Sequence, residues 1–292
     1  MVEFPFSPME PILTHQPFSD PSYAFQVKWD GVRMLVKKRG DDVLLVNRKG
    51  KNRTALYPDI ANEVRKLKVH DCILDGEMIS FGKDGKPDFR QILHRDLAKK
   101  PKLSVPVCFV AFDCVQHDGV WLLERALEDR YEVLEDVVSV PGLVQRTENF
   151  ADGMELFQSM ERMQMEGIVA KRKGSAYHPG GKSGEWQKVK CWRYTVAEGL
   201  FLKWRDERPN AVIVGTNNEP TNEVFGAVAT GIPESEWGRL TAWSESGPEA
   251  VKGHPDWTRL RPGIQMKIRF LEWTDDGKLR APVVQSISYP SL

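Results

Sequence analysis

The stretch KWDGVR, residues Lys28–Arg33, decides how the rest of the chain is interpreted. Alternating apolar runs stand on both sides of it, YAFQV at 23–27 and MLV at 34–36, which predict a strand before and after it. Lys28 is therefore expected at a strand end, beside a glycine turn that lets the backbone approach whatever the lysine faces. A lysine amine becomes a nucleophile when desolvation or nearby cations lower its pKa, and Arg33 could supply such a cation. An ordinary surface hairpin is the alternative interpretation of these six residues.

Composition bounds the class of protein. The 292 residues are enough for one large or two ordinary domains, and 41% hydrophobic with 28% charged residues is typical of a soluble globular protein. No apolar run approaches the roughly 18 residues of a membrane span, and no signal-peptide core is found. The four cysteines (Cys72, Cys108, Cys114 and Cys191) fit neither a metal-site spacing nor a disulfide framework. A protein of the reducing cytoplasm with no membrane association is predicted.

Charge is balanced overall but segregated along the chain. The 41 basic and 41 acidic residues cancel. Residues 28–53 nevertheless hold nine Lys or Arg against three Asp, and residues 171–193 hold seven against one Glu, whereas residues 118–136 hold two basic and seven acidic residues. Segregation of this kind can build a basic face that binds nucleic acid. Solvated charged faces without a partner are the alternative.

Hydrophobic periodicity predicts mixed elements before Cys191 and mostly strands after it. The expected strands of the first part are 23–27, 34–36, 43–46, 72–79, 105–115, 167–171 and 186–190, and the expected helices start at Pro58 and cover 89–97, 123–138 and 152–165. Residues 1–22 contain five prolines and are expected to form an extended lead-in over the surface. The second part is expected to contain strands 195–203, 211–215, 224–230 and 264–273 and a helix at 233–243, which suits a small Greek-key barrel of the OB type. Periodicity alone does not separate such a barrel from a small sandwich. We therefore predict domains at 1–193 and 194–292.

Further charged clusters follow strand-like runs. LDGE (74–77) sets two carboxylates around a glycine, EGIVAKR (166–172) sets a carboxylate and a lysine at opposite ends of a short strand, and WQKVK (186–190) sets two lysines on one face. Arg48 ends another strand before Gly50. A nucleophilic lysine, carboxylates for a hard cation and several cations for phosphate are what nucleotidyl transfer requires.

This ordered set resembles the covalent nucleotidyltransferases and, within them, the ATP-dependent DNA ligases. KWDGVR, LDGE, the pair Phe112-Asp113, EGIVAK and KVK occur in the family's order over most of the chain. The likeness is strongest to the ligase domain of bacterial end-joining ligases, and it includes the lead-in Pro11-Ile12-Leu13 and the tail Leu279-Arg280-Ala281-Pro282. The resemblance implies an α+β fold, in which a nucleotidyltransferase (adenylation) domain of antiparallel sheets with flanking helices precedes an OB-fold β-barrel.

The resemblance also implies roles for individual residues. Lys28 would attack the α-phosphate of ATP and become lysyl-AMP. The other implied ATP contacts are Gln26 and Val27 beside the base, Arg33 and Glu77 at the ribose, Arg48 at the phosphate, Phe112 stacked on adenine, Lys171, Lys188 and Lys190 at the α-phosphate and leaving group, and Arg280 on the barrel. Glu166, with Glu77, would bind the catalytic Mg²⁺ or Mn²⁺. The basic segment Arg48, Lys49, Lys51 and Arg53 would contact DNA.

Several of these assignments have alternatives. Gln26 stands where the family often has Glu, although its amide oxygen can still accept a hydrogen bond from adenine. Phe112 lies in an apolar run where a core residue is common, and Phe109 could take its place at the base. Glu77 and Glu166 taken singly could be solvated charges, and Lys188 and Lys190 could guard an exposed sheet edge. Arg280 is the best match to the barrel arginine, and a further acidic-lysine pair is missing.

The predicted function is an ATP-dependent DNA ligase that seals 5′-phosphate/3′-hydroxyl nicks or breaks in duplex DNA during repair, replication or recombination. In the family the second domain closes over ATP for the first step and then swings away to grip DNA. We expect a monomer in a bacterial or phage-like cytoplasm that is associated with the nucleoid. An end-binding protein could recruit it to DNA ends. The alternatives are an RNA ligase or a capping-type guanylyltransferase with the same lysine chemistry, and a non-enzymatic OB-type single-strand binder.

Overall fold

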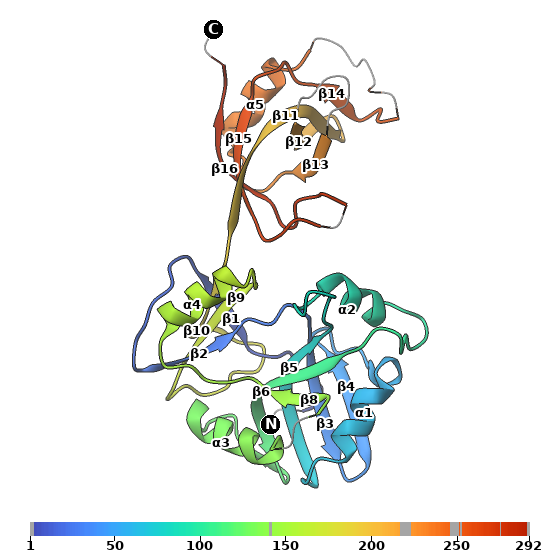
Figure 1. The fold of residues 1–292 in the computed structure, drawn as a ribbon, viewed down its shortest axis with the longest axis vertical. Coiled ribbons are helices and arrows are strands. Elements are labelled where there is room, and N and C mark those ends of the chain that lie inside the picture. Colours follow the sequence, from blue (N-terminus) through green and yellow to red (C-terminus); the bar gives the residue numbers. More distant parts are fainter. Residues whose placement is uncertain are drawn as a thin grey trace. The chain divides into compact units, whose positions relative to one another are not determined.

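The computed structural model describes residues 3–139, 142–216, 223–245, 251, 253–274 and 276–290. The chain forms two compact units, Met1–Cys191 and Trp192–Leu292 (Figure 1). Each unit has its own buried apolar core. The two are therefore described separately.

The first unit is built on two sheets. The smaller has the order β1-β10-β9-β2 and consists of β1 (Glu10–Thr14), β2 (Tyr23–Val27), β9 (Gly167–Arg172) and β10 (Lys182–Lys190). The larger has the order β4-β3-β5-β6-β7, with β8 paired to β6, and consists of β3 (Val32–Arg39), β4 (Asp42–Asn47), β5 (Asp71–Ile79), β6 (Cys108–His117), β7 (Val120–Trp121) and β8 (Val144–Arg146). Pairing is antiparallel except between β1 and β10 and between β6 and β8. Ile73, Val115 and Trp186 form one buried cluster across the facing sides of the two sheets.

Helices cover the outer faces of both sheets. α1 (Pro58–Arg65), α2 (Phe89–Asp96) and α3 (Leu127–Val137) share a core with β3, β5 and β6, and the short 3₁₀ helix η1 (Thr54–Leu56) precedes α1. α4 (Gly153–Arg162) packs Leu156 and Met160 against Phe25 and Ile168 of the smaller sheet. Side chains alternate along a strand, so Gln26 beside Phe25 faces the larger sheet instead. Each sheet therefore turns an apolar side to its helices and its more polar side to the other sheet.

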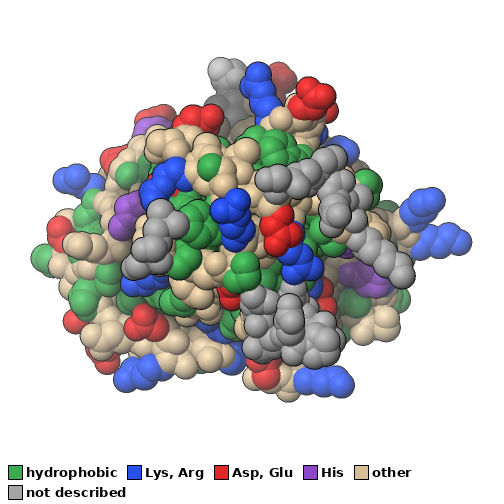
Figure 2. Space-filling view, turned by 90° about the horizontal axis from the view of Figure 1, so that it is seen from above, with side chains coloured by type: hydrophobic (Ala, Val, Ile, Leu, Met, Phe, Trp, Pro, Cys, Tyr) green, Lys and Arg blue, Asp and Glu red, His purple; other side chains and the backbone are tan. Residues whose placement is uncertain are grey.

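The second unit is one antiparallel sheet with a helix. Its order is β13-β12-β11-β15-β16, with β14 paired to β11, and its elements are β11 (Arg193–Arg205), β12 (Arg208–Thr216), β13 (Glu223–Val228), α5 (Glu234–Ala242), β14 (Trp257–Arg259), β15 (Gln265–Phe270) and β16 (Val283–Ser288). Leu202, Val212, Leu240, Ile268 and Phe270 belong to its buried core. In the end view of Figure 2, Lys and Arg side chains are interspersed with Asp and Glu among the described residues.

Most expected elements are found within a few residues of their predicted bounds. The helix expected at 233–243 is α5, and the helix expected at 152–165 is α4, which Asp152 caps by accepting from the Met154 and Glu155 amides. The lead-in over 1–22 is only partly as expected, because Glu10–Thr14 pairs with β10 and Met9 is fully buried. The strands β7, β8, β14 and β16 were not expected.

The structure also bears on the cysteines and on the lengths of the helices. All four cysteines are buried and unbridged. None of the helices in the described part of the chain has the length and apolar character needed to span a bilayer.

Candidate active site

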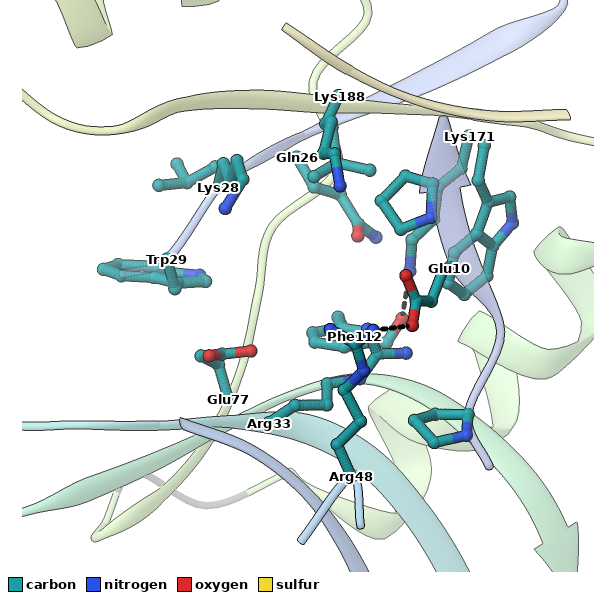
Figure 3. Close-up of a pocket in the computed structure, with 15 residues that line it drawn as sticks. Glu10, Gln26, Lys28, Trp29, Arg33, Arg48, Glu77, Phe112, Lys171 and Lys188 are labelled. Atoms are coloured by element: carbon teal, nitrogen blue, oxygen red, sulfur yellow. Dashed lines mark hydrogen bonds and ion pairs between the residues drawn. The ribbon is translucent and has the colours of Figure 1, made fainter. Parts of the chain in front are cut away.

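A pocket opens between the facing sides of the two sheets of the first unit (Figure 3). It brings together nine of the residues that the sequence singled out: Gln26, Val27, Lys28, Arg33, Arg48, Glu77, Phe112, Lys171 and Lys188. Pro8, Glu10, Pro11, Trp29, Val169 and Trp186 complete the lining. The pocket is therefore mainly cationic, with an apolar wall.

Lys28 stands at the end of β2, where its backbone N–H donates to Gly167 O at 2.9 Å. Its Nζ forms an ion pair with the Glu166 carboxylate, and Lys190 Nζ lies 3.4 Å from the other oxygen of that carboxylate. The Lys28 and Glu166 side chains are only 19% and 8% exposed. An ammonium held in this way has no lone pair for attack, so the amine becomes nucleophilic only after Glu166 takes another partner and a proton leaves.

Two glycines make this arrangement possible. A Cβ on Gly31 would lie 2.2 Å from Met78 O, so only glycine lets the KWDG turn approach β5 closely. Gly167 has a φ of +141°, and a Cβ there would lie 2.0 Å from Val189 O. The glycines of KWDG and EGIVAK thus bring Lys28, Glu77 and Glu166 to one place.

Arg33 forms a rigid cationic wall. Its Nε and one terminal nitrogen donate to the two oxygens of Asp75, each at 2.5 Å, and the same terminal nitrogen donates to Met9 O at 3.0 Å. Tyr177 also donates to Asp75 at 2.5 Å. Burial alone would lower the pKa of Arg33, but the Asp75 carboxylate more than offsets this and the net pKa is raised. Asp75 and Tyr177 therefore fix the guanidinium in place.

Lys171 is the most enclosed cation of the pocket. It is 2% exposed, its Nζ donates to Phe112 O at 3.0 Å, and it lies 3.9 Å from the centroid of the Trp186 ring. Burial lowers the pKa of Lys171 to about 7, although Asp113 and Asp75 act in the opposite direction. The ammonium is also 4.4 Å from the Phe112 centroid, and the Arg33 guanidinium is 4.5 Å from it. The Phe112 ring thus contacts two cationic side chains. Its stacking on adenine stays a prediction.

Of the two predicted metal ligands, Glu166 pairs with Lys28 and Glu77 lines the pocket. Burial raises the pKa of Glu77 to about 8, while Arg33 and Lys28 lower it and Glu166 raises it further. The described residues contain no group of three or more His, Cys, Asp or Glu side chains suited to a metal. Mg²⁺, however, is commonly held by one or two carboxylates together with substrate phosphates. Glu77 and Glu166 fit that kind of site.

The remaining basic residues differ in exposure. Arg48, 64% exposed, pairs with Glu10 at the rim, and Lys49 and Lys51 are exposed on the turn that follows β4. Arg53 is less accessible and lies 3.5 Å from Asp96. Burial lowers the pKa of Lys188, helped by Lys28 and Lys190.

Arg280 belongs to the second unit, where its guanidinium pairs with Glu272 at 2.9 Å. Its predicted role stays a prediction.

Sequence reasoning did not assign a site role to six residues of the lining, among them Trp186 and Glu10. Trp186 could have been found, because it is two residues before Lys188 and so points to the same side of β10. Glu10 gave no signal, because its place depends on the pairing of β1 with β10, about 170 residues away.

The comparisons with known proteins decide the family. A sequence model described as the ATP dependent DNA ligase domain matches residues 8–190. The chain belongs to the ATP-dependent DNA ligase family. The multifunctional non-homologous end joining protein LigD of Mycolicibacterium smegmatis is 30% identical over 275 residues, which cover 89% of this chain and 35% of LigD. A DNA ligase of Thermococcus fumicolans is 30% identical over 271 residues, 85% of this chain and 47% of that ligase.

Solved structures of this ligase family agree with the fold. The ligase domain of M. tuberculosis LigD has 26% identity and a TM-score of 0.58, covering 97% of this chain and 95% of that one. A mycobacterial DNA ligase D complexed with ATP and MES has 27% identity and a TM-score of 0.58, with coverage of 99% and 97%. The chain thus spans about a third of the first LigD relatives but nearly the whole of these ligase domains.

Proposed function

We propose that the chain seals 5′-phosphate/3′-hydroxyl breaks in duplex DNA with ATP, through an AMP bound to Lys28. The observation that carries the proposal is Lys28 itself. Its amine pairs with the Glu166 carboxylate at a pocket lined by Arg33, Lys171 and Lys188. Lys171, by contrast, is enclosed by two aromatic rings.

The first step follows from this arrangement. Lys28 Nζ would attack the α-phosphorus of ATP, forming a P–N bond while the P–O bond to pyrophosphate breaks. The protons that the lysine loses before and during formation of the P–N bond would go to solvent. Lys188 and Arg33 would stabilise the charge that develops on the phosphate oxygens. AMP would then pass to a DNA 5′-phosphate, and a 3′-hydroxyl would displace it.

Glu77 and Glu166 would hold a divalent cation, Mg²⁺ or Mn²⁺. Such an ion acts as a Lewis acid on a phosphoryl oxygen. Glu166 would hold the cation with the carboxylate that pairs with Lys28 in this structure.

The second unit is proposed to be an OB-type barrel that grips DNA. Val284 N–H donates to Thr230 O at 2.9 Å, and Leu279 N–H donates to Phe225 O at 2.8 Å, so the segments near the two outer strands of the sheet are linked. We propose that Arg48, Lys49, Lys51 and Arg53 contribute phosphate contacts, so that affinity falls steeply with salt. The LigD relatives are named for end joining, which supports a role in DNA repair. A monomer in the bacterial cytoplasm, recruited by an end-binding protein, is part of the same proposal.

The first prediction is that Lys28→Arg abolishes both lysyl-AMP formation and nick sealing. A guanidinium is not deprotonated at accessible pH, so it cannot attack phosphorus. The measurement is transfer of label from α-labelled ATP to the protein, followed by sealing of a nicked duplex. Lys182→Arg, at an exposed position of β10, is the matched control and should label like the parent.

The same assay separates the alternatives. A Lys28→Arg protein that still takes up label would show that another residue is the nucleophile. Label from GTP with none from ATP would indicate a guanylyltransferase, and sealing of nicked RNA alone would indicate an RNA ligase. No adduct from either nucleotide would favour a single-strand binder.

A further inference from the structure

Gln26 presents an oriented amide to the pocket. It is 2% exposed and points from β2 into the space beside Lys171 and Phe112 (Figure 3). Its Nε2 donates to Asn149 Oδ1 at 2.7 Å. This bond directs the nitrogen side of the amide toward Asn149, so the oxygen, with its two lone pairs, is the acceptor that the amide presents to a ligand.

Asn149 is well placed to control this orientation. It does not line the pocket, but its backbone is fixed on both sides. Phe150 exchanges two backbone hydrogen bonds with Phe25, at 2.8 and 3.0 Å, directly beside Gln26. On the other side, Thr147, two residues before Asn149, accepts a hydrogen bond from the Tyr131 hydroxyl at 2.6 Å.

We propose that Asn149 is a positioning residue for base selection, which holds Gln26 with its carbonyl oxygen toward the nucleobase so that a 6-aminopurine is taken and a 6-oxopurine is rejected. The inference rests on the proposed function. Adenine carries an amino donor at this position, whereas guanine carries an acceptor. An acceptor opposite an acceptor leaves two desolvated oxygens unpaired, and sites that depend on such a hydrogen bond discriminate strongly.

The hydrogen bond to Asn149 matters because Gln26 is not a carboxylate. A carboxylate presents acceptor oxygens in either orientation. A glutamine amide rotated by half a turn would instead present its nitrogen, which could donate to the 6-oxo group of guanine. To rotate in the parent, Gln26 must either lose its bond to Asn149 or rotate together with it. Removal of the Asn149 amide therefore removes the barrier to accepting guanine.

The experiment compares single-turnover rates of lysyl-nucleotide formation with α-labelled ATP and GTP in the full chain. Asn149→Leu should lower the ATP-to-GTP ratio by roughly tenfold or more, mainly through a gain with GTP. Asn149→Asp is the matched control, because its carboxylate still accepts from Gln26 Nε2 and cannot rotate into a donor. Its ratio should equal or exceed that of the parent.

A rescue variant tests the orientation itself. Gln26→Glu combined with Asn149→Leu should regain the preference for ATP, because both carboxylate oxygens are acceptors. An Asn149→Leu protein with an unchanged ratio, or with ATP and GTP rates reduced equally, would overturn the inference while leaving the proposed function intact. A parent that forms no adduct with ATP would instead overturn the proposed function on which the inference depends.

Discussion

At the scale of single residues, two lysines of the pocket differ in what surrounds them. Lys171 lies between the rings of Phe112 and Trp186 and donates to Phe112 O, whereas Lys28 lies among carboxylates. The low pKa of Lys171 would suit a nucleophile, yet its enclosure keeps the amine from a phosphorus atom. Geometry therefore favours Lys28 as the proposed nucleophile.

The second prediction concerns the pH dependence of stability. The folded-state pKa of Lys171 is about 7, against an ordinary 10.5, so between these values the unfolded chain binds more protons and the free energy of unfolding rises with pH. Between the two pKa values, the free energy of unfolding rises by up to about 1.4 kcal/mol per pH unit. Below pH 7, Lys171 is charged in the folded chain and the full cost of burying that charge is present. Lys171→Met should be more stable than the parent at pH 6, with the difference shrinking toward pH 9 in denaturant unfolding.

The control for this prediction is Lys182→Met, an exposed lysine of β10. Its difference from the parent should not depend on pH, since the substitution removes no buried charge. A Lys171→Met protein that is less stable than the parent at every pH would show that packing, and not desolvation of the ammonium, dominates at this position.

Residue types and their order made most of the site predictable. Lys28, Glu77, Phe112, Lys171 and Lys188 line one pocket, in keeping with the family resemblance. The partners of these residues were not predictable, because a side chain pairs with whatever the fold brings beside it. The ion pair of Lys28 with Glu166 joins positions 138 residues apart, and nothing local to either indicates it.

At the scale of elements, local pattern located strands but not all of their pairings. β5 and β6 were predicted well because long apolar runs fill both faces. β1 was missed because it is short and contains Pro11, and it exists as a strand only through its parallel pairing with β10. The pocket needs that pairing, since Glu10 and Pro11 form part of its lining.

The third prediction is that Gly167→Ala destabilises the first unit. Alanine at a φ of +141° is strained by about 1–3 kcal/mol, and its Cβ would lie 2.0 Å from Val189 O, so β9 and β10 would have to separate. A loss of at least about 2 kcal/mol in the free energy of unfolding is expected. Lysyl-AMP formation should fall as well, because Lys28 N–H donates to Gly167 O.

Gly174→Ala is the matched control, because nothing lies within 4 Å of the Cβ it would add. Its stability should stay within about 0.5 kcal/mol of the parent. Equal stabilities of the Gly167 and Gly174 variants in denaturant unfolding would contradict the strain argument.

At the scale of the whole molecule, the chain divides where its composition changes, after Cys191. The pocket residues all belong to the first unit. Whether the strands of the second unit close into a barrel depends on registers that alternation along the sequence does not specify. The resemblance alone assigns a residue of this unit, Arg280, to the triphosphate.

The fourth prediction tests that assignment. Arg280→Ala should slow lysyl-AMP formation by about 10- to 1000-fold, the range expected when one phosphate-directed charge is lost. If the arginine orients pyrophosphate as the leaving group, it stabilises the first transition state alone. Sealing of a nick that already carries 5′-AMP should change much less, since no pyrophosphate leaves in that reaction. Single-turnover rates of both reactions, variant against parent, are the measurement.

Glu272→Gln provides the matched control for Arg280. It weakens the 2.9 Å ion pair that Arg280 makes within its own unit but keeps the guanidinium. If Arg280 acts on the triphosphate, Glu272→Gln should adenylylate at least as fast as the parent, because less is lost when the guanidinium leaves Glu272. If the ion pair between Arg280 and Glu272 only stabilises the second unit, both variants should have lower thermal stability. Both reactions should then be slower to a similar extent in each variant. Equal losses in the two reactions would thus assign Arg280 to the fold or to DNA, and unchanged rates would remove it from the site.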